Sequence, residues 1–293
     1  MEKVVSIIVR LIFSRLKLWK YIPDRIYLRI IYYYKFHKAL NLTEPKTYNE
    51  KLQWLKLNDK NPLYTKLVDK YAVKKIVAEM IGSKYVIPTI GIWDNVYDIN
   101  WDSLPNQFVL KCTHDSGGIV ICKDKSSLNI QEAYEKLDKS LHFNYYKVSR
   151  EWPYKKVPRR VLCEPYIEDL STKELRDYKF FCFNGVVKAM FIASERQTNK
   201  EPFFNFFDIN FNELIFTQGH PRKIPAPAKP KRFEEMVEIA EKLSVGMPHV
   251  RIDLYEVNGQ VLFGEYTFYH HGGFVPFVPS SWDTIFGNWI SLI

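Results

Sequence analysis

Residues 249–268 read HVRIDLYEVNGQVLFGEYTF. Apolar and polar residues alternate from Val250 to Leu254, and a second run with apolar residues at alternate positions follows Asn258-Gly259. An Asn-Gly pair favours the tight turn that joins two antiparallel strands. The stretch therefore predicts a β-hairpin with one apolar face.

Two acidic residues, Asp253 and Glu265, interrupt these apolar strands. A buried carboxylate needs a partner, and a metal ion is one such partner. If Asn258-Gly259 is a two-residue turn, Asp253 lies opposite Gly264, and Glu265 points to the other face. Both acids share a face only if the loop has an odd count, such as three residues with a bulge. Two surface acids on an exposed sheet face are the alternative.

Further hairpins and helices surround this stretch. Residues 178–194 form a second predicted hairpin around Asn184-Gly185, and 108–114 pairs with 118–124. Residues 160–167 predict a strand, 130–142 and 233–244 predict helices, and 220–231 is a proline-rich loop. Antiparallel hairpins interleaved with helices are typical of an α+β fold.

The region before the first hairpin is helical in pattern. Thr47-Tyr48-Asn49-Glu50 has the form of a capping box and predicts a helix that runs to about Leu57. Asn61-Pro62 begins a second periodic run, which predicts one helix as far as Gly82.

A lysine beside a glycine turn is the first candidate for phosphate binding. Lys111 ends an apolar strand, and residues 113–118 follow it with Gly117 and Gly118. An ammonium group and exposed backbone amides can together hold a phosphate. An ordinary β-turn with an exposed lysine has the same pattern, so both interpretations stay open.

Positive charge is concentrated at one end of a chain of 293 residues with a net charge of +9. Residues 1–40 hold nine lysines and arginines against Glu2 and Asp24. Residues 3–38 predict helices with one apolar and one basic face, which either lie on an anionic bilayer or cap the body of the protein. No nucleic-acid-reading motif accompanies the charge, so nucleic acid is not an expected partner.

The expected cellular compartment follows from the lack of an evident targeting signal and from the pattern of the cysteines. No signal peptide is evident, and no run reaches the roughly 18 apolar residues of a spanning helix. The four cysteines include no CxxC pair and predict small buried side chains in a reducing compartment. We therefore expect a cytoplasmic protein, with the basic segment available to the inner face of the membrane.

The order of the motifs resembles that of ATP-grasp enzymes. The series is Asp69-Lys70, IPTIG, FVLKCTHDSGG, CEPYI, RDYKFF and VRIDLYEVNGQVLFGEYTFY. The sequence closely resembles the TupA-like family of teichuronopeptide biosynthesis over about residues 45–285. The segments that carry this resemblance include YNEKLQWLKL, NPLYTKLVDKYAV and EWPY. The resemblance implies an ATP-grasp fold, with two α/β subdomains clasping the nucleotide after a basic helical segment. It divides the chain into a basic amphipathic segment (1–45), a helical part (46–104), a subdomain with the glycine loop (105–163) and one with the metal site (164–293).

The same resemblance implies a role for each matching residue. Lys70 and Lys111 match the phosphate lysines, and His114, Ser116, Gly117 and Gly118 lie in the loop that closes over the triphosphate. Glu164, Tyr166 and Ile167 match the hinge around adenine, Asp177 the acid near the ribose, and Lys179 a phosphate contact. Asp253 and Glu265 match the two magnesium carboxylates, and Thr267 stands where the family has an asparagine ligand. Arg251 shares a strand face with Asp253 and is expected to contact phosphate or substrate, so Lys111, Lys179 and Arg251 are the catalytic candidates.

The implied activity is that of an ATP- and Mg²⁺-dependent carboxylate–amine ligase that forms an amide through an acyl phosphate. By family analogy, the partners are an amino acid or peptide amine and a polysaccharide or lipid-linked glycan that carries a uronic acid. A nucleophilic triad is not needed for phosphoryl transfer, and none stands out.

Two other functions stay open at this point. A glycosyltransferase of capsule or O-antigen biosynthesis would act on a similar substrate, although the sequence lacks the DxD motif of metal-dependent transferases. A non-catalytic binding module is the other, and Thr267 is its best support because a hydroxyl binds magnesium more weakly.

Overall fold

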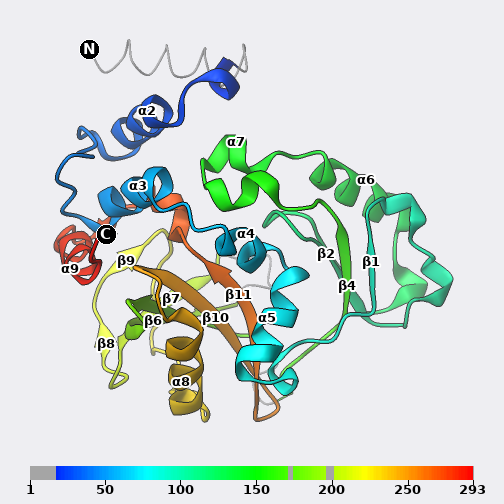
Figure 1. The fold of residues 1–293 in the computed structure, drawn as a ribbon. Helices are drawn as coiled ribbons and strands as arrows, with labels where there is room; N and C mark the ends of the chain where they lie inside the picture. The colour runs from blue at the N-terminus through cyan, green and yellow to red at the C-terminus, as the bar shows by residue number, and fades with distance from the viewer. Residues whose placement is uncertain (1–17, 171–173, 196–200, 293) are drawn as a thin grey trace.

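A computed structural model describes residues 18–170, 174–195 and 201–292 (Figure 1). Within these ranges the chain forms two main antiparallel sheets with helices packed on them, which confirms the α+β prediction. The α-helices are α2 (Asp24–Phe36), α3 (Tyr48–Asn58), α4 (Leu63–Val68), α5 (Ala72–Ile81), α6 (Ile130–Leu141), α7 (Tyr145–Ser149), α8 (Phe233–Ser244) and α9 (Ser281–Trp289). Short 3-10 turns are η2 (Leu18–Tyr21), η3 (Ser83–Tyr85), η4 (Val96–Asp98), η5 (Trp101–Ser103), η6 (Lys125–Ser127), η7 (Trp152–Lys156) and η8 (His270–Gly273).

The larger sheet has the strand order β11-β10-β5-β6-β7-β8. Its strands are β5 (Asp177–Phe183), β6 (Val186–Ser194), β7 (Phe203–Asp208), β8 (Glu213–Leu214), β10 (Val250–Val257) and β11 (Gln260–Thr267). Both predicted Asn-Gly turns are present, since Asn184, Gly185, Asn258 and Gly259 all have positive φ.

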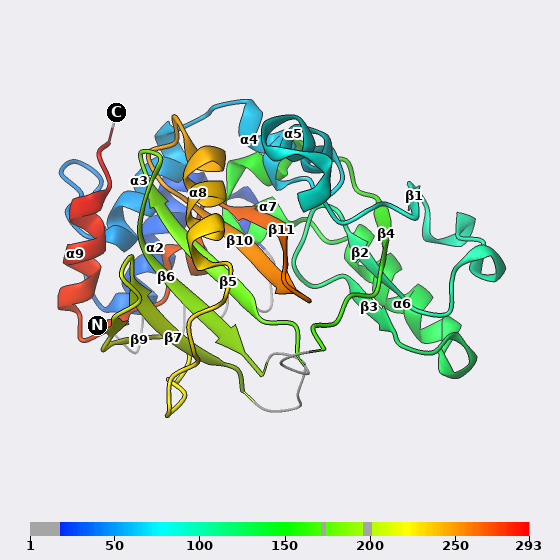
Figure 2. The ribbon, with the colours of Figure 1, turned by 90° about the horizontal axis from the view of Figure 1, so that it is seen from below.

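Helices cover both faces of this sheet. Phe180 of β5 packs on Phe233 of α8, whereas the next residue, Phe181, packs on Tyr48 of α3 and Phe286 of α9. Consecutive strand residues point to opposite faces, so α8 lies on one face and α3 with α9 on the other (Figure 2). Every residue of β5 is consequently buried.

The smaller sheet has the order β1-β4-β2-β3 and its own core. Its strands are β1 (Gly91–Trp93), β2 (Phe108–Cys112), β3 (Ile119–Cys122) and β4 (Val161–Pro165). Helix α6 packs on β2 and β3 through Ala133 and Leu137, which belong to the same apolar cluster as Phe108 and Leu110. All four cysteines are buried and free, as predicted. A further pair of strands, β9 (Thr217–Gln218) and β12 (Phe277–Val278), lies beside the larger sheet.

The prediction of one helix from Asn61-Pro62 to Gly82 is wrong. The chain forms two helices, α4 and α5, with a break at Asp69 and Lys70. The Asp69 carboxylate accepts hydrogen bonds from the backbone amides of Tyr71 (2.9 Å) and Ala72 (3.2 Å), so it caps a new helix instead of continuing the old one. The capping box of α3 is confirmed, with Thr47 and Glu50 bonding each other's backbone amides.

The basic segment packs on the body over its described part. Helix α2 buries Tyr27, Leu28 and Tyr32, and Asp24 forms an ion pair with Arg150 at 2.9 Å. The predicted helical pattern before residue 18 lies outside the described residues. In the part of the chain that the structure describes, no helix has the length and apolar character needed to cross a membrane.

Candidate functional site

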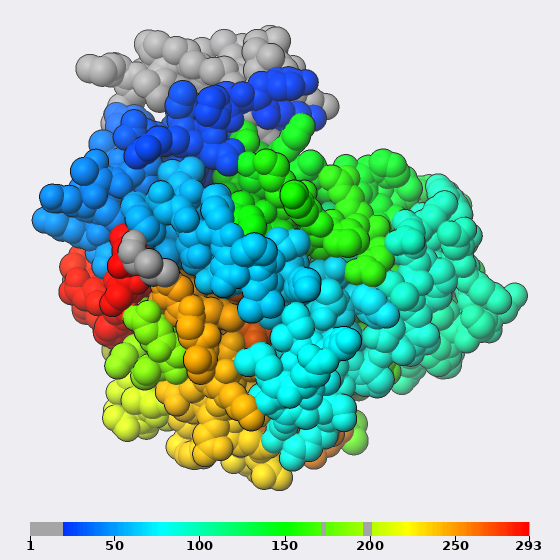
Figure 3. Space-filling view, viewed as in Figure 1, coloured from blue at the N-terminus to red at the C-terminus, as the bar shows by residue number. Residues whose placement is uncertain are grey.

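A cavity of about 280 Å³ lies between the two main sheets. Helix α5 closes one side of the cavity. Figure 3 shows α4 and α5 (light blue to cyan) at the surface, between the part of the molecule built on the larger sheet and the part built on the smaller sheet. The lining of the cavity includes both apolar and charged side chains. The apolar residues include Val73, Val86, Ile87, Val109, Ile119, Ile121, Pro165, Ile167, Leu175 and Phe263, and the polar ones are Lys70, Lys74, Lys111, Ser116, Glu164, Tyr166, Asp177, Tyr255 and Glu265.

Glu164 lies between two lysines. Its carboxylate is 2.6 Å from Lys111 Nζ on β2 and 2.5 Å from Lys74 Nζ on α5. Burial alone would raise the pKa of Glu164, but the two ammonium groups outweigh it and lower that pKa below its usual value. The Glu164 carboxylate therefore positions Lys74 and Lys111, and the following residues, Pro165 to Ile167, line the cavity.

Lys70 reaches the glycine loop from the break between α4 and α5. Its backbone amide bonds the Thr113 carbonyl at 3.3 Å, and its ammonium donates to the Asp115 carbonyl. The helix break thus places Lys70 beside the loop that follows Lys111. In a continuous helix the Lys70 amide would bond within the helix and would not reach the Thr113 carbonyl.

The loop itself is held in place by Asp115 and Gly118. Asp115 accepts hydrogen bonds from the Gly118 amide (3.2 Å) and from the Ser140 hydroxyl of α6. A Cβ at Gly118 would collide with Ser140 and Cys112, so glycine is needed here for close packing. Of the predicted loop residues, Ser116 lines the cavity, whereas His114 is buried with Nε2 3.1 Å from the Phe143 carbonyl oxygen.

The hairpin of β10 and β11 keeps a two-residue turn and still brings the two acids together. The register shifts in the middle of the pair, so that Asp253 lies opposite Glu265 while Leu254 lies opposite Phe263. Gly264 is the extra residue of a β-bulge. The extra residue that a shared face requires therefore lies within strand β11 and not in the turn.

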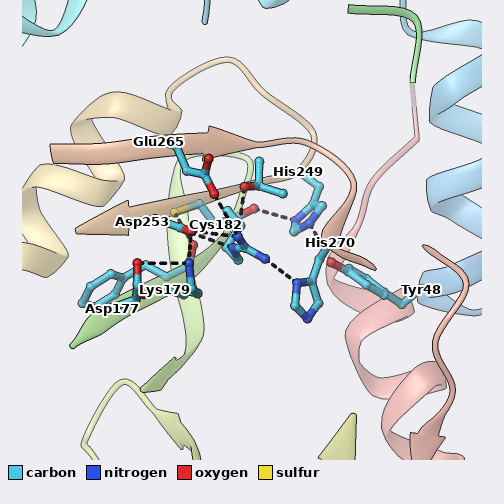
Figure 4. A network of polar contacts seen from close by, with 11 residues as sticks. Tyr48, Asp177, Lys179, Cys182, His249, Asp253, Glu265 and His270 are labelled. Carbon is cyan, nitrogen blue, oxygen red and sulfur yellow. Dashed lines mark hydrogen bonds and ion pairs between the residues drawn. The ribbon is translucent and has the colours of Figure 1, made fainter. Parts of the chain in front are cut away.

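Asp253 is the centre of a buried ionic network (Figure 4). Arg251 binds both of its oxygens, with Nε 2.7 Å from Oδ1 and Nη2 2.7 Å from Oδ2, and Lys179 also donates to Oδ2. Lys179 lies 3.4 Å from Asp177 as well. Burial would raise the pKa of Asp253, but Arg251 and Lys179 lower it, so the carboxylate stays ionised.

Arg251 also contacts the residues at the end of β11. Its Nη2 donates to Thr267 Oγ1 at 3.0 Å, and Nη1 donates to His270 Nδ1. Because His270 Nδ1 accepts, the ring is neutral and carries its proton on Nε2. Burial lowers the pKa of His270, which is consistent with that tautomer. The arginine is fixed from several sides, and its guanidinium position is set before any substrate arrives.

A second neutral histidine, His249, lies next to this network and connects two elements of the fold. His249 Nδ1 lies 3.0 Å from the Cys182 carbonyl oxygen, and its Nε2 lies 2.9 Å from the Tyr48 hydroxyl (Figure 4). Burial lowers the pKa of His249 to about 3, so it acts as a structural link between α3 and the larger sheet.

Glu265 differs from Asp253 in exposure. Its side chain is 43% exposed and lines the cavity, and its closest cation is Arg251 Nη2 at 3.7 Å. Within the described ranges no group of three or more His, Cys, Asp or Glu side chains could hold a metal ion. Mg²⁺ usually binds through one or two carboxylates together with phosphate oxygens and waters. Of the three predicted ligands, Glu265 lines the cavity. Asp253 and Thr267 both accept hydrogen bonds from Arg251, and all three carry oxygen donors of the kind that magnesium prefers.

Several cavity residues were not predicted from the sequence. Lys74 lies in the first turn of α5, whereas Lys70 lies in the break before that helix, so helical spacing from Lys70 does not predict its place in the cavity. Val109 and Lys111 alternate on β2, so the strand pattern around Lys111 already contained the apolar neighbour. The period-two pattern of β2 is thus a local signal for Val109, whereas Lys74 has none.

Solved structures resemble this chain only weakly, both in sequence identity and in TM-score. D-alanine–D-alanine ligase from Bacillus anthracis complexed with ATP shares 16% identity at a TM-score of 0.38, over 69% of this chain and 54% of that one. The biotin carboxylase domain of Hydrogenobacter thermophilus 2-oxoglutarate carboxylase, in complex with MgADP and bicarbonate, shares 16% identity at a TM-score of 0.41, over 69% of this chain and 40% of that one. The chain thus spans about half the length of these proteins or less.

A family comparison is more informative than these structures. No curated protein sequence matches the chain significantly. The family model described as TupA-like ATPgrasp matches residues 50–291, which is most of the chain and includes every cavity residue named above. The chain therefore belongs to the TupA-like ATP-grasp family.

Proposed function

We propose that this protein is an ATP-dependent carboxylate–amine ligase. The observation that carries the proposal is the cavity between the sheets, whose lining combines apolar side chains with the ammonium groups of Lys70 and Lys111 and the carboxylate of Glu265. Such a cavity suits a nucleotide, because a base needs an apolar slot and a triphosphate needs cations. Family membership supports the same assignment.

Each predicted residue has a role on this proposal. Ile167 and Tyr166 contact adenine, Asp177 lies near the ribose, and Lys70, Lys111 and the 114–118 loop bind the phosphates. Glu265 and Asp253, with Thr267 as a weaker donor, would hold magnesium, which neutralises phosphate charge when it is bound. Lys179 and Arg251 both bond Asp253, and on this proposal their positive charges stabilise the transferred phosphoryl group or the substrate carboxylate.

The chemistry requires positioning more than a protein nucleophile. A carboxylate is a poor electrophile, and transfer of the γ-phosphoryl group converts it to an acyl phosphate with a good leaving group. Arg251 is held by Asp253, Thr267 and His270, so its charge is fixed where negative charge develops. An amine then attacks the acyl carbon to give the amide, with release of phosphate.

The substrate class is the finer part of the proposal. By family analogy, the carboxylate is a uronic acid of a bacterial surface polysaccharide, and the amine belongs to an amino acid or peptide. A lipid-linked glycan at the inner membrane face would bring this substrate close to the basic residues 1–40.

Ligand-dependent stability is the first test. The melting temperature of the purified protein is measured with a non-hydrolysable ATP analogue plus Mg²⁺, and separately with UDP-sugars plus Mg²⁺. Ligand at about 100 times its Kd adds roughly 2.7 kcal/mol to the free energy of unfolding. A rise with the ATP analogue alone is expected, whereas a rise only with a sugar nucleotide would replace the ligase by a glycosyltransferase.

Turnover is the second test. ADP release is measured with ATP and Mg²⁺ over a panel of uronic acids, each with and without amino acids. We expect release that needs both a uronic acid and an amine. Release that depends on neither substrate contradicts the proposed acyl transfer.

A further inference from the structure

Lys74 is a cavity residue to which the proposed function gives no role. It lies in the first turn of α5 and lines the cavity together with Lys70 and Lys111. Its side chain is 13% exposed, and its ammonium donates to the Ile87 carbonyl at 2.6 Å and pairs with Glu164 Oε1 at 2.5 Å. Two acceptors therefore hold this lysine at the wall of the cavity.

Lys111 is held less firmly than Lys74. Its side chain is 23% exposed, and within residues 18–170, 174–195 and 201–292 its ammonium has one acceptor, Glu164 Oε2 at 2.6 Å. The two lysines thus bond different oxygens of the same carboxylate. If one of them turns to a ligand, Lys111 loses a single contact, whereas Lys74 would lose two.

The register of the smaller sheet shows in which direction Lys111 can turn. Val109 lies opposite Glu164 of β4, whereas Lys111 lies opposite Leu162 and is two residues closer to the glycine loop. The Lys111 side chain therefore reaches Glu164 diagonally, back along the strand. The glycine loop, residues 113–118, follows β2 and contributes to the lining of the same cavity. A rotation of the Lys111 side chain thus moves its ammonium from Glu164 toward this loop, where the proposed function places the phosphates.

Glu164 can release one of its two cations but not both. The residue is only 5% exposed, and a buried carboxylate without any partner is strongly unfavourable. With Lys111 turned away, Lys74 still pairs with Oε1 and keeps the carboxylate compensated. In the free protein Glu164 thus has one cation more than its charge requires, and that cation is available to a phosphate.

We infer that Lys74 is a positioning residue that stays bound to Glu164 when a nucleotide arrives, and that it thereby allows Lys111 to leave this carboxylate for the phosphates. The inference rests on the proposed nucleotide site and adds to it the exchange of partners that makes Lys111 available. Lys74 acts through Glu164 and Lys111 and does not itself contact the phosphates.

Removal of Lys74 should therefore hold Lys111 on Glu164. In Lys74→Met the Lys111 ammonium is the last cation of a buried carboxylate, so its departure leaves that carboxylate unpaired and phosphate affinity falls. In Lys74→Met/Glu164→Gln the carboxylate is removed as well, so Lys111 is free to turn and the affinity returns. This recovery distinguishes an exchange of partners from a direct contact between Lys74 and the ligand.

Tripolyphosphate is the probe for this exchange, because it carries the phosphates without a base that Glu164 could contact. Its affinity in the presence of Mg²⁺ is measured by isothermal titration at fixed ionic strength. We expect Lys74→Met to bind about tenfold or more weakly than the wild type, and Lys74→Met/Glu164→Gln to bind within about threefold of the wild type. Lys75→Met, at the next position of α5 with a side chain that is 84% exposed, is the matched control and should bind like the wild type.

Two results would overturn the role of Lys74. One is that folded Lys74→Met binds tripolyphosphate as tightly as the wild type. The other is that the double variant binds about tenfold more weakly than the wild type, which would mean that Lys74 contacts the ligand directly.

Melting curves check that each variant is folded. Should Lys74→Met not fold, the double variant still gives the answer, because it lacks Lys74 and should bind tripolyphosphate like the wild type. Addition of Lys111→Met to the double variant should then lower the affinity by the same factor as it does in the wild type.

A nucleotide titration separates this inference from the proposed function. The same variants are titrated with a non-hydrolysable ATP analogue plus Mg²⁺, and Lys74→Met should lose affinity by the same factor as for tripolyphosphate, since the lost contact is with the phosphates. A wild type that binds neither ligand contradicts the nucleotide site, and the role of Lys74 with it. A wild type that binds both, with no change in Lys74→Met, leaves the nucleotide site in place and excludes the role of Lys74 alone.

Discussion

Asp253 on β10 lies directly opposite Glu265 on β11. The next pair toward the turn is Leu254 and Phe263, so Gly264 on β11 has no partner on β10. Without that bulge the pair would be Asp253 and Gly264, and the Glu265 side chain would leave the cavity. One unpaired glycine therefore determines whether the two candidate metal ligands share a face.

Replacement of Gly264 tests this relationship. A Cβ at Gly264 would lie 2.9 Å from the Asp253 carbonyl oxygen and 3.1 Å from Tyr255, so the strand must shift. We expect Gly264→Ala to lose about 1–3 kcal/mol of stability in chemical denaturation and to weaken Mg²⁺-dependent nucleotide affinity. Gly259→Ala is the control, because it strains a positive φ with no atom within 4 Å. It should lower stability alone, and equal nucleotide affinities in the two variants would contradict the role of the bulge.

The two acids should respond differently to neutral substitution. Asp253→Asn leaves Arg251 and Lys179 buried without their counter-ion, which costs about 3–5 kcal/mol of folding free energy. Glu265→Gln removes a carboxylate that is 43% exposed, so stability should change little. Nucleotide affinity of Glu265→Gln should nevertheless lose most of its dependence on Mg²⁺.

Thermal unfolding and nucleotide titration at several Mg²⁺ concentrations measure these two effects. If Glu265→Gln keeps the full magnesium dependence, Glu265 is not a metal ligand. If Asp253→Asn is as stable as the wild type, the buried network contributes nothing to the fold.

Lys111 is expected to contribute directly to nucleotide binding. Loss of one charge-assisted contact costs about 1.5–3 kcal/mol, so Lys111→Met should weaken ATP binding roughly 10- to 100-fold. Lys75→Met is a suitable control because its ammonium is 84% exposed and 3.9 Å from Glu79. Isothermal titration with an ATP analogue compares the variants, and equal affinities would exclude Lys111 from the phosphate site.

Glu151 is a buried carboxylate between α7 and η7, and it should make the free protein less stable as the pH rises. Its folded pKa is raised from about 4.5 to about 7, so the folded state holds the proton more tightly than the unfolded state does. Stability attributable to this proton is present below pH 4.5 and is lost as the pH rises through 7. Glu151→Gln should therefore stabilise the free protein at pH 8, by at most about 3 kcal/mol, and have little effect at pH 4. Melting curves at the two pH values measure this, and a destabilised variant at pH 8 would contradict the raised pKa of Glu151.

Local signals in the sequence were sufficient for much of the fold. Asn184-Gly185 and Asn258-Gly259 need positive φ, and the Thr47–Glu50 capping box is a contact between near neighbours. Such features do not depend on the rest of the chain. Strand β7 was missed because its central residues, Phe204–Phe207, are buried on both faces and therefore show no alternation.

The parts of the site that the sequence did not predict depend on distant contacts. The bulge at Gly264 has no composition signal of its own, and the break at Asp69 depends on a side chain that caps α5 instead of extending α4.

Helix α2 is tied to the segment that carries Glu151. Asp24 bonds both Arg150 and the Tyr146 hydroxyl (2.6 Å), and the Tyr27 hydroxyl donates to the Val148 carbonyl (2.7 Å). A rotation of α2 that keeps these contacts moves the backbone of residues 146–150, and Glu151 follows in the chain. The amino-terminal helix and the segment that carries Glu151 are thus joined by three hydrogen bonds, so a displacement of the helix is expected to displace this buried carboxylate as well.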